Sequence, residues 1–97
     1  MIIRIVKLTL RPEEMETFKH YFDTVNDTIR NQPGCHLLQA WQDINQPHIF
    51  FTYSLWDSEE DLDRYRNSAF FGVFWKTVKA WFGDKAEAWS FHKIVDK

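Results

Sequence analysis

The side chains best suited to acid–base chemistry near neutral pH are four histidines spread along the chain. His20 falls on the outward side of a predicted helix and His48 borders a predicted hairpin loop, so we expect both to be exposed. His36 and His92 fall in predicted strands and are the candidates for a general base, although strand register decides which face each occupies. No two histidines have the spacing of a helical metal site, and we predict no metal. The base therefore stays unassigned between His36 and His92.

Large aromatic side chains on both sides of a charged segment are the second feature with chemical meaning. Alternate residues of one predicted strand share a face that mixes rings, hydroxyls and an imidazole: His48, Phe50, Thr52, Ser54 and Trp56. That mixture suits the wall of a pocket for a flat organic ligand, and we place Thr52 and Trp56 on it. The alternative is structural, with Thr52 favouring the strand conformation and Trp56 filling the core.

Aromatic residues in the following helical segments are predicted to complete this pocket. Tyr65 points inward from a short helix, where it could donate a hydrogen bond or act as a weak acid; the alternative is that it simply packs in the core. Phe70, Phe71 and Trp75 belong to the next helix and could equally be ordinary core. The predicted catalytic candidates are Trp56, Tyr65, His36 and His92, and the predicted substrate-binding residues are Thr52, Trp56, Phe70, Phe71 and Trp75.

Size and composition restrict the class of protein. The 97 residues fit one domain spanning residues 1–97, yet 44% are hydrophobic and 18% aromatic. This excess over a small core indicates a subunit interface, a ligand pocket or both. The net charge of −2, without a basic stripe, argues against a nucleic-acid partner. The apolar segment at the N-terminus is too short, and contains too many polar residues, for a signal peptide or a membrane span.

The cysteine count bears on the compartment. Cys35 is the single cysteine, so the chain cannot form an internal disulfide, which fits a reducing compartment. We therefore predict a cytoplasmic protein. Cys35 could be a nucleophile, but a small buried thiol at the start of a strand is the favoured interpretation.

Hydrophobic periodicity gives the order of the elements. Residues 2–11, 35–43, 48–56 and 86–95 read as strands, and residues 44–47 as a hairpin loop. Apolar residues spaced by three and four, from Met15 to Ile29, predict a long first helix. Ser58 with Asp61 resembles a capping box, Ser68 is expected to cap a further helix, and Gly83 to end it.

The resulting β-α-β-β-α-α-β order predicts an α+β fold. It corresponds to the ferredoxin-like split β-α-β arrangement, a four-stranded antiparallel sheet with helices on one face. Ile49, Phe51, Tyr53 and Leu55 would face the other side of that sheet. Because this second face is also apolar, we expect another copy of the chain to cover it in a homodimer.

Two segments resemble the antibiotic biosynthesis monooxygenase family of dimeric α+β barrels. They are "QPGCHLL" after the first helix and "SLWDSEEDLDRYRNSAFF" after the hairpin, with Trp56-Asp57-Ser58 as the most specific unit. The resemblance implies a homodimer whose sheets face one another, with a pocket between sheet and helices. It further implies oxidation of hydroquinones or polycyclic phenols by O2 with neither metal nor flavin, and hence no cofactor.

The chain departs from the family pattern at its histidines. Positions where relatives often carry histidine fall on Tyr65 and Phe70, and the asparagine and histidine of haem-degrading relatives fall on Val6 and Trp75. The leading hypothesis is a cofactor-independent monooxygenase acting on a small quinol-like or polycyclic phenolic substrate. The alternatives are a non-catalytic dimeric module that binds an aromatic metabolite and, less favoured, a haem-binding or haem-degrading relative, since Trp75 is no axial ligand.

Overall fold

The computed structural model describes all residues from 1 to 97 and confirms the predicted order of elements. The elements are β1 (Ile2–Thr9), the 3-10 helix η1 (Pro12–Glu14), α1 (Met15–Arg30), β2 (Cys35–Gln42), β3 (Ile49–Trp56), α2 (Glu59–Arg66), α3 (Ala69–Lys79) and β4 (Glu87–Phe91). None of these helices combines the length and the hydrophobicity needed to cross a membrane.

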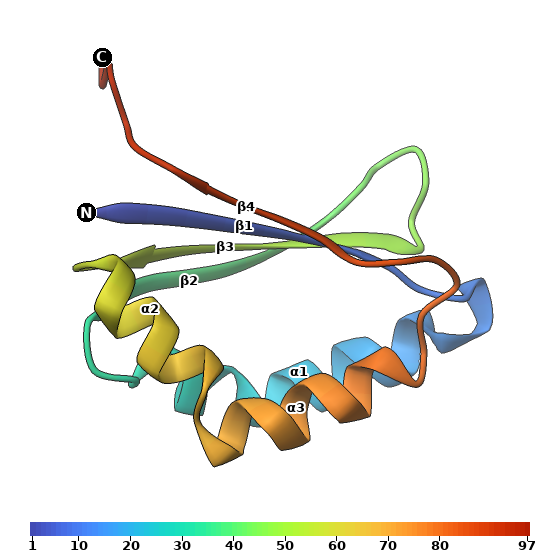
Figure 1. The fold of residues 1–97 in the computed structure, drawn as a ribbon. Coiled ribbons are helices and arrows are strands. Elements are labelled where there is room, and N and C mark those ends of the chain that lie inside the picture. The colour runs from blue at the N-terminus through green and yellow to red at the C-terminus, as the bar shows by residue number, and fades with distance from the viewer.

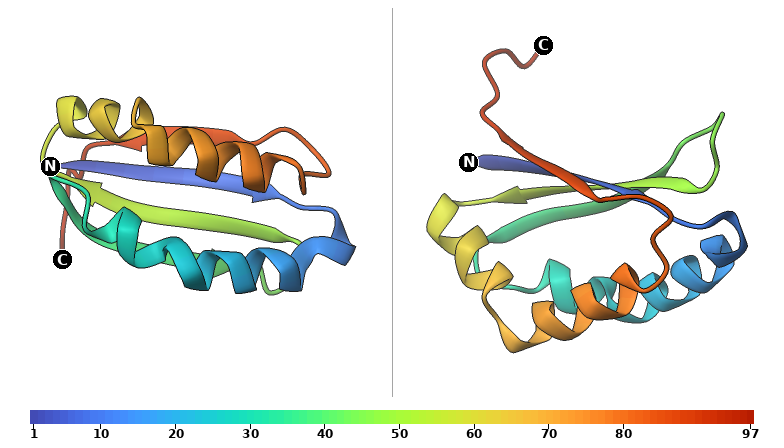
Figure 2. Two further views of the ribbon diagram at one scale, coloured as in Figure 1. Left: turned by 90° about the horizontal axis from the view of Figure 1, so that it is seen from below. Right: turned by 45° about the vertical axis from the view of Figure 1, so that its right-hand side comes forward.

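The four strands form one antiparallel sheet in the order β2-β3-β1-β4. All helices lie against the same face of this sheet, which gives two layers (Figures 1 and 2). This arrangement confirms the predicted ferredoxin-like α+β fold. It also leaves the two faces of β1 and β3 in different surroundings, because only one of them is covered by the chain's own helices.

The register decides which side chains meet the helices. Val6 lies opposite Thr52, and Leu8 opposite Phe50, so the even-numbered residues of β1 and β3 share the helix-facing side. The most deeply buried large side chains come from this side and from the helices packed on it: Trp56, Phe18, Leu8, Leu10 and Val78. The predicted inward stripe of α1 is confirmed, since its residues Phe18, Phe22 and Ile29 are buried.

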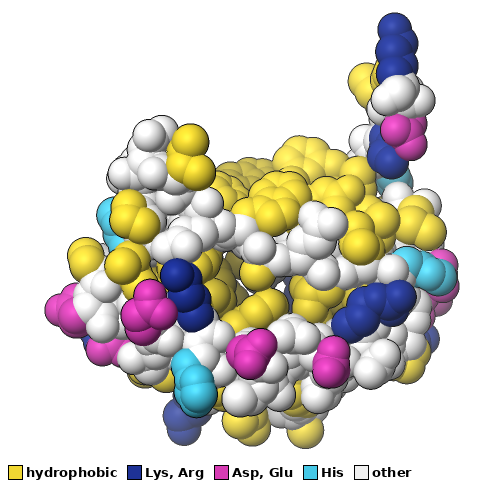
Figure 3. Space-filling view, turned by 180° about the vertical axis from the view of Figure 1, so that it is seen from behind, with side chains coloured by type: hydrophobic (Ala, Val, Ile, Leu, Met, Phe, Trp, Pro, Cys, Tyr) yellow, Lys and Arg dark blue, Asp and Glu magenta, His cyan; other side chains and the backbone are white.

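The opposite side of the sheet, here called the open face, carries the odd-numbered residues of the same strands. Trp89 and Phe91 of β4 lie opposite Ile5 and Ile3, and their side chains are 40% and 46% exposed. Trp41 of β2 is 43% exposed and stacks on Tyr53 with the ring centroids 5.1 Å apart. Figure 3 shows hydrophobic side chains gathered along the upper side of the molecule, over this face. The chain by itself leaves this apolar surface uncovered.

Several predicted element boundaries are wrong for physical reasons. The last strand ends at Phe91 rather than at residue 95, and residues 93–95 would have no partner because β1 begins at Ile2. The first strand ends at Thr9 rather than at residue 11, leaving only an isolated bridge between Leu10 and Phe82. The 3-10 turn that contains Pro12 precedes α1.

Serine caps start both short helices. The Ser58 hydroxyl accepts a hydrogen bond from the Asp61 backbone N–H at 3.2 Å, as predicted. The carboxylate of Asp61 does not reach back to the Ser58 backbone N–H; it accepts a hydrogen bond from the Ser58 hydroxyl instead. The Ser68 hydroxyl caps α3 by accepting from the Phe71 N–H at 3.1 Å. α3 ends at Lys79, before the predicted Gly83, whose N–H donates to the carbonyl of Thr9.

Gly34 makes the turn that joins α1 to β2 beside the start of α2. Its φ of 84° lies in the left-handed region, and a Cβ there would come within 2.4 Å of the Asp61 side chain. Its carbonyl accepts a hydrogen bond from the Asp57 N–H at 2.8 Å. This single turn therefore ties the end of β3 and the capped start of α2 to the beginning of β2.

We predict that Gly34→Ala lowers the free energy of unfolding by about 1–3 kcal/mol, since alanine pays for the positive φ and clashes with Asp61. Gly72→Ala is the matched control, because a Cβ at Gly72 in α3 meets nothing within 4 Å. That substitution should raise stability by about 0.5–1 kcal/mol. Urea denaturation of both variants measures the difference, and equal effects at the two glycines would contradict this role for Gly34.

Candidate functional site

A cavity of about 310 Å³ lies between the helix-facing side of the sheet and the three α-helices. Thirteen of its 18 lining residues are hydrophobic. The structure places five of the six aromatic or hydroxyl residues predicted for the pocket on this wall, namely Thr52, Trp56, Tyr65, Phe71 and Trp75. Sheet and helices thus bring together residues that are up to 23 positions apart in the sequence, and the wall they form suits a planar apolar ligand.

Trp56 is the most deeply buried residue of this wall. It is 1% exposed, and its indole N–H donates a hydrogen bond to the Ser54 hydroxyl at 2.9 Å. Its ring stacks on that of Tyr65 with the centroids 5.1 Å apart and the planes 21° from parallel. A buried tryptophan with its polar atom satisfied offers a flat, fixed surface to a ligand.

Tyr65, near the end of α2, is positioned by rings on two sides. It stacks on Trp56 and meets the edge of Phe71 at 5.1 Å. Burial raises the pKa of its phenol well above the ordinary value of 10.0. Tyr65 therefore stays protonated at neutral pH, which suits a hydrogen-bond donor and excludes a general base.

The helix α3 supplies the lower wall. Phe71 and Trp75 lie one turn apart and stack at 5.7 Å with their planes 12° from parallel. Phe70 does not line the cavity, although it was predicted to bind substrate. The helical turn directs it to another side of α3 than Phe71, and its ring stacks on Phe74 with the centroids 6.1 Å apart.

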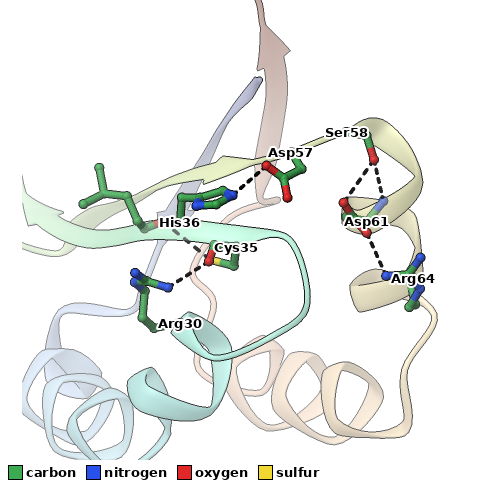
Figure 4. A network of polar contacts seen from close by, with 8 residues as sticks. Arg30, Cys35, His36, Asp57, Ser58, Asp61 and Arg64 are labelled. Carbon is green, nitrogen blue, oxygen red and sulfur yellow. Dashed lines mark hydrogen bonds and ion pairs between the residues drawn. The ribbon is translucent and has the colours of Figure 1, made fainter.

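Neither predicted catalytic histidine lies at the cavity. The β2–β3 register shifts between Cys35 and Leu37, and this irregularity takes His36 out of the regular alternation. Its Nε2 lies 2.6 Å from Oδ1 of Asp57, in a pair that is about half exposed (Figure 4). His92 follows the end of β4 at Phe91 and is exposed. The positions of His36 and His92 therefore do not support the prediction that one of them is the general base of this site.

Two arginines at the cavity were missed by the sequence analysis. Arg4, in the middle of β1, lines the cavity and donates a hydrogen bond to the Ser90 hydroxyl at 3.1 Å. Arg66, the last residue of α2, also lines it and forms an ion pair with Asp63. Arg4 is the one charged residue among the helix-facing positions of β1, and that exception to an apolar pattern was the available signal.

Electrostatics at this end of the cavity reflect two positive charges close together. The pKa of Arg4 is lowered chiefly by burial and further by the neighbouring charge of Arg66, while Asp63 opposes the shift. The remaining wall is apolar apart from hydroxyls and Glu87. The cavity is therefore an aromatic slot with one cationic end.

Other residues with reactive potential lie away from this slot. Cys35 is buried and unpaired, and burial raises the pKa of its thiol, as expected for a structural cysteine. No three His, Cys, Asp or Glu side chains are grouped so that they could hold a metal ion. No histidine lines the cavity, so an axial histidine ligand for haem is missing from its wall. Two adjoining hollows lie between α1 and β2, and both share Phe22 with the wall of the cavity (Figure 3).

The raised pKa of Tyr65 predicts a specific loss of stability in alkali. Above pH 10.0 the unfolded chain loses this phenolic proton before the folded chain does, so the free energy of unfolding should fall as pH rises. Tyr65→Phe should show a shallower fall over that range than the wild type. Chemical denaturation at several alkaline pH values measures the slopes, with Tyr53→Phe on the open face as the matched control. Identical slopes for wild type and Tyr65→Phe would show that Tyr65 is not buried as described.

Solved structures with the same fold cover nearly the whole chain. An antibiotic biosynthesis monooxygenase superposes with a TM-score of 0.90 at 16% identity, over 98% of this chain and all of that one. A protein of Nitrosomonas europaea, provisionally assigned to the same class, gives 0.89 at 18% identity over 98% and 100%. A conserved protein of Methanosarcina mazei gives 0.87 at 21% identity over 96% and 93%. At these identities the similarity establishes the fold alone.

Sequence comparison supplies the family. A search of curated proteins found no match. Residues 1–77, which include β1, α1, the β2–β3 hairpin and most of α3, match the sequence model described as antibiotic biosynthesis monooxygenase. The chain therefore belongs to the antibiotic biosynthesis monooxygenase family.

Proposed function

We propose that this protein is a cofactor-independent monooxygenase that oxidises a quinol-like or polycyclic phenolic small molecule with O2 in the cavity between sheet and helices. The observation that carries this proposal is the cavity itself, a partly open slot walled by Trp56, Tyr65, Phe71 and Trp75. Family membership supports an oxygenase, and the aromatic wall supports a flat, electron-rich substrate.

The proposed oxygenation requires the protein only to bind the substrate and to stabilise its negatively charged form. The ionised substrate gives one electron to O2, and the substrate radical and superoxide then combine to form a carbon–oxygen bond. Loss of water from the resulting peroxide converts a CH2 group to a carbonyl, so one oxygen atom enters the product and the other leaves as water. The apolar walls would exclude bulk water, and the protonated Tyr65 could donate a hydrogen bond to a developing oxyanion.

A second candidate function is a non-catalytic module that binds an aromatic metabolite. The observation in its favour is that no histidine lines the cavity, which leaves the wall without an ordinary base. The two functions share the same ligand class and differ only in turnover. A haem-related function receives no support from the lining residues.

We further propose that the protein works as a homodimer in which a second copy covers the open face. The support is the row of half-exposed rings, Trp41, Trp89 and Phe91, on a surface that continues across all four strands. An apolar surface of this kind on a soluble chain is typical of an interface. The single unpaired cysteine supports a cytoplasmic location for the dimer.

Oxygen consumption tests the proposed reaction directly. Metal-stripped protein in the presence of chelator should consume O2 with at least one member of a panel of hydroquinones and anthrones, and yield an oxygenated product. Ala88→Leu should reduce this rate at least about tenfold, because Ala88 lines the cavity from the edge strand β4 and a larger side chain would occupy it. Binding of the same compounds without O2 uptake would establish the binding module instead.

Trp89→Glu should shift the protein from dimer to monomer at micromolar concentration, because a carboxylate on the open face cannot be buried without a partner. Val73→Glu is the matched control, since Val73 is 66% exposed on α3, away from the sheet. Light scattering coupled to size exclusion measures both masses. A monomeric wild type would contradict the proposed dimer.

A further inference from the structure

We propose that the ligand of the cavity carries an oxyanion at one edge of its ring system, a phenolate or a carboxylate, and that Arg4 and Arg66 bind it. This inference rests on the proposed function in one respect, since both place the ligand in the same cavity. It adds the charge of the substrate and the residues that select it.

Arg4 has unused hydrogen-bonding capacity beside an apolar wall. Its guanidinium has five N–H donors, and its one side-chain hydrogen bond is to the neutral hydroxyl of Ser90. Arg4 takes part in no ion pair, in contrast to Arg11, Arg64 and Arg66. A partly buried arginine without a carboxylate partner is uncommon, and a bound anion would supply that partner.

Arg66 adds a second positive charge to the same end. It lies at the C-terminus of α2 and shares the cavity wall with Arg4, and its charge acts on Arg4. Asp63, its ion-pair partner, balances only one of the two guanidinium groups. This end of the cavity therefore keeps a net positive charge that a ligand anion can neutralise.

The other charges near this end do not remove that excess. Glu87 borders the cavity, but the β1–β4 register sets it opposite Lys7, on the side of the sheet that forms the open face. The residue opposite this carboxylate is thus a lysine on the same side of the sheet. No further acidic residue lines the cavity.

The cationic end offers a route to substrate ionisation without a protein base. Two guanidinium groups favour the charged form of a bound phenol and so lower its pKa, with the released proton passing to water. The phenolate is also the form that gives an electron to O2. This explains how the cavity could support oxygenation although neither His36 nor His92 reaches it.

A matched pair of probes isolates the charge of the ligand. Naphthalene-2-carboxylate and naphthalene-2-carboxamide share rings and shape, and 2-naphthol reports a phenol arm through the absorption band of its anion. Titrations of tryptophan fluorescence should show that the wild type binds the carboxylate at least about tenfold tighter than the carboxamide. If 2-naphthol binds as its anion at neutral pH, the phenolate is assigned as well; if only naphthalene-2-carboxylate binds with this preference, the carboxylate is.

Arg4→Gln should weaken naphthalene-2-carboxylate about tenfold and leave the carboxamide nearly unchanged, as expected for the loss of a charge-assisted hydrogen bond. Arg66→Gln should act in the same direction. Arg64→Gln is the matched control from the same helix, because Arg64 is exposed, pairs with Asp61 and does not line the cavity. Should Arg4→Gln fail to fold, Arg4→Lys keeps the charge and should retain most of the preference.

Equal affinity of the wild type for the two probes, or an equal loss in Arg64→Gln, would overturn the inference. That result would leave the proposed function standing if the carboxamide still binds in the cavity. Absence of O2 uptake with the anion preference intact would instead reject the monooxygenase and retain the anionic ligand. The two failures are therefore distinguishable.

Discussion

The stack of Trp56 on Tyr65 is the contact on which the site depends. Trp56 is the last residue of β3 and Tyr65 lies in α2, so this contact sets how far the helix layer stands from the sheet. The hydrogen bond from Trp56 to Ser54 prevents the indole from turning, and the edge of Phe71 holds Tyr65 from the other side. Because α3 follows α2 after two residues, its inward rings take their position from the same contact. The cavity is the space that remains between the sheet and the helix layer at this separation.

One sheet serves two purposes because strand residues alternate between its faces. The helix-facing side combines apolar residues with Ser54, Thr52 and Arg4, as a ligand wall requires. The open face carries exposed rings together with Lys7 and Glu87, and the chain has no helices on that side to cover it. In a chain of 97 residues this division explains the high aromatic content: the rings fill one core, wall one cavity and coat one face.

Much of the fold could be predicted from the sequence, because its signals are local. These signals are the three- and four-residue spacing in α1, the serine caps at Ser58 and Ser68, and the β2–β3 hairpin. The connection in that hairpin spans residues 43–48 rather than the predicted 44–47. The helix-facing side of β3 was predicted correctly because strict alternation holds from Ile49 to Trp56.

The site was harder to predict because it depends on register and on where pairing stops. The irregularity at Cys35–Leu37 takes His36 out of alternation, and β4 ends at Phe91, before His92. Phe70 was predicted to line the cavity together with Phe71, but neighbouring residues on a helix point about 100° apart, and only Phe71 lines it. Arg4 and Arg66 come together only when α2 packs back over the sheet. No spacing in the sequence predicts that these two residues are close.

The most direct test is a crystal structure of the protein grown with naphthalene-2-carboxylate. We predict that the rings lie in the cavity against Trp56 and Trp75, with the carboxylate about 2.7–2.9 Å from guanidinium nitrogens of Arg4 or Arg66. Density for the ligand on the open face or in the hollows between α1 and β2, with the cavity empty, would contradict the assignment of this cavity as the functional site.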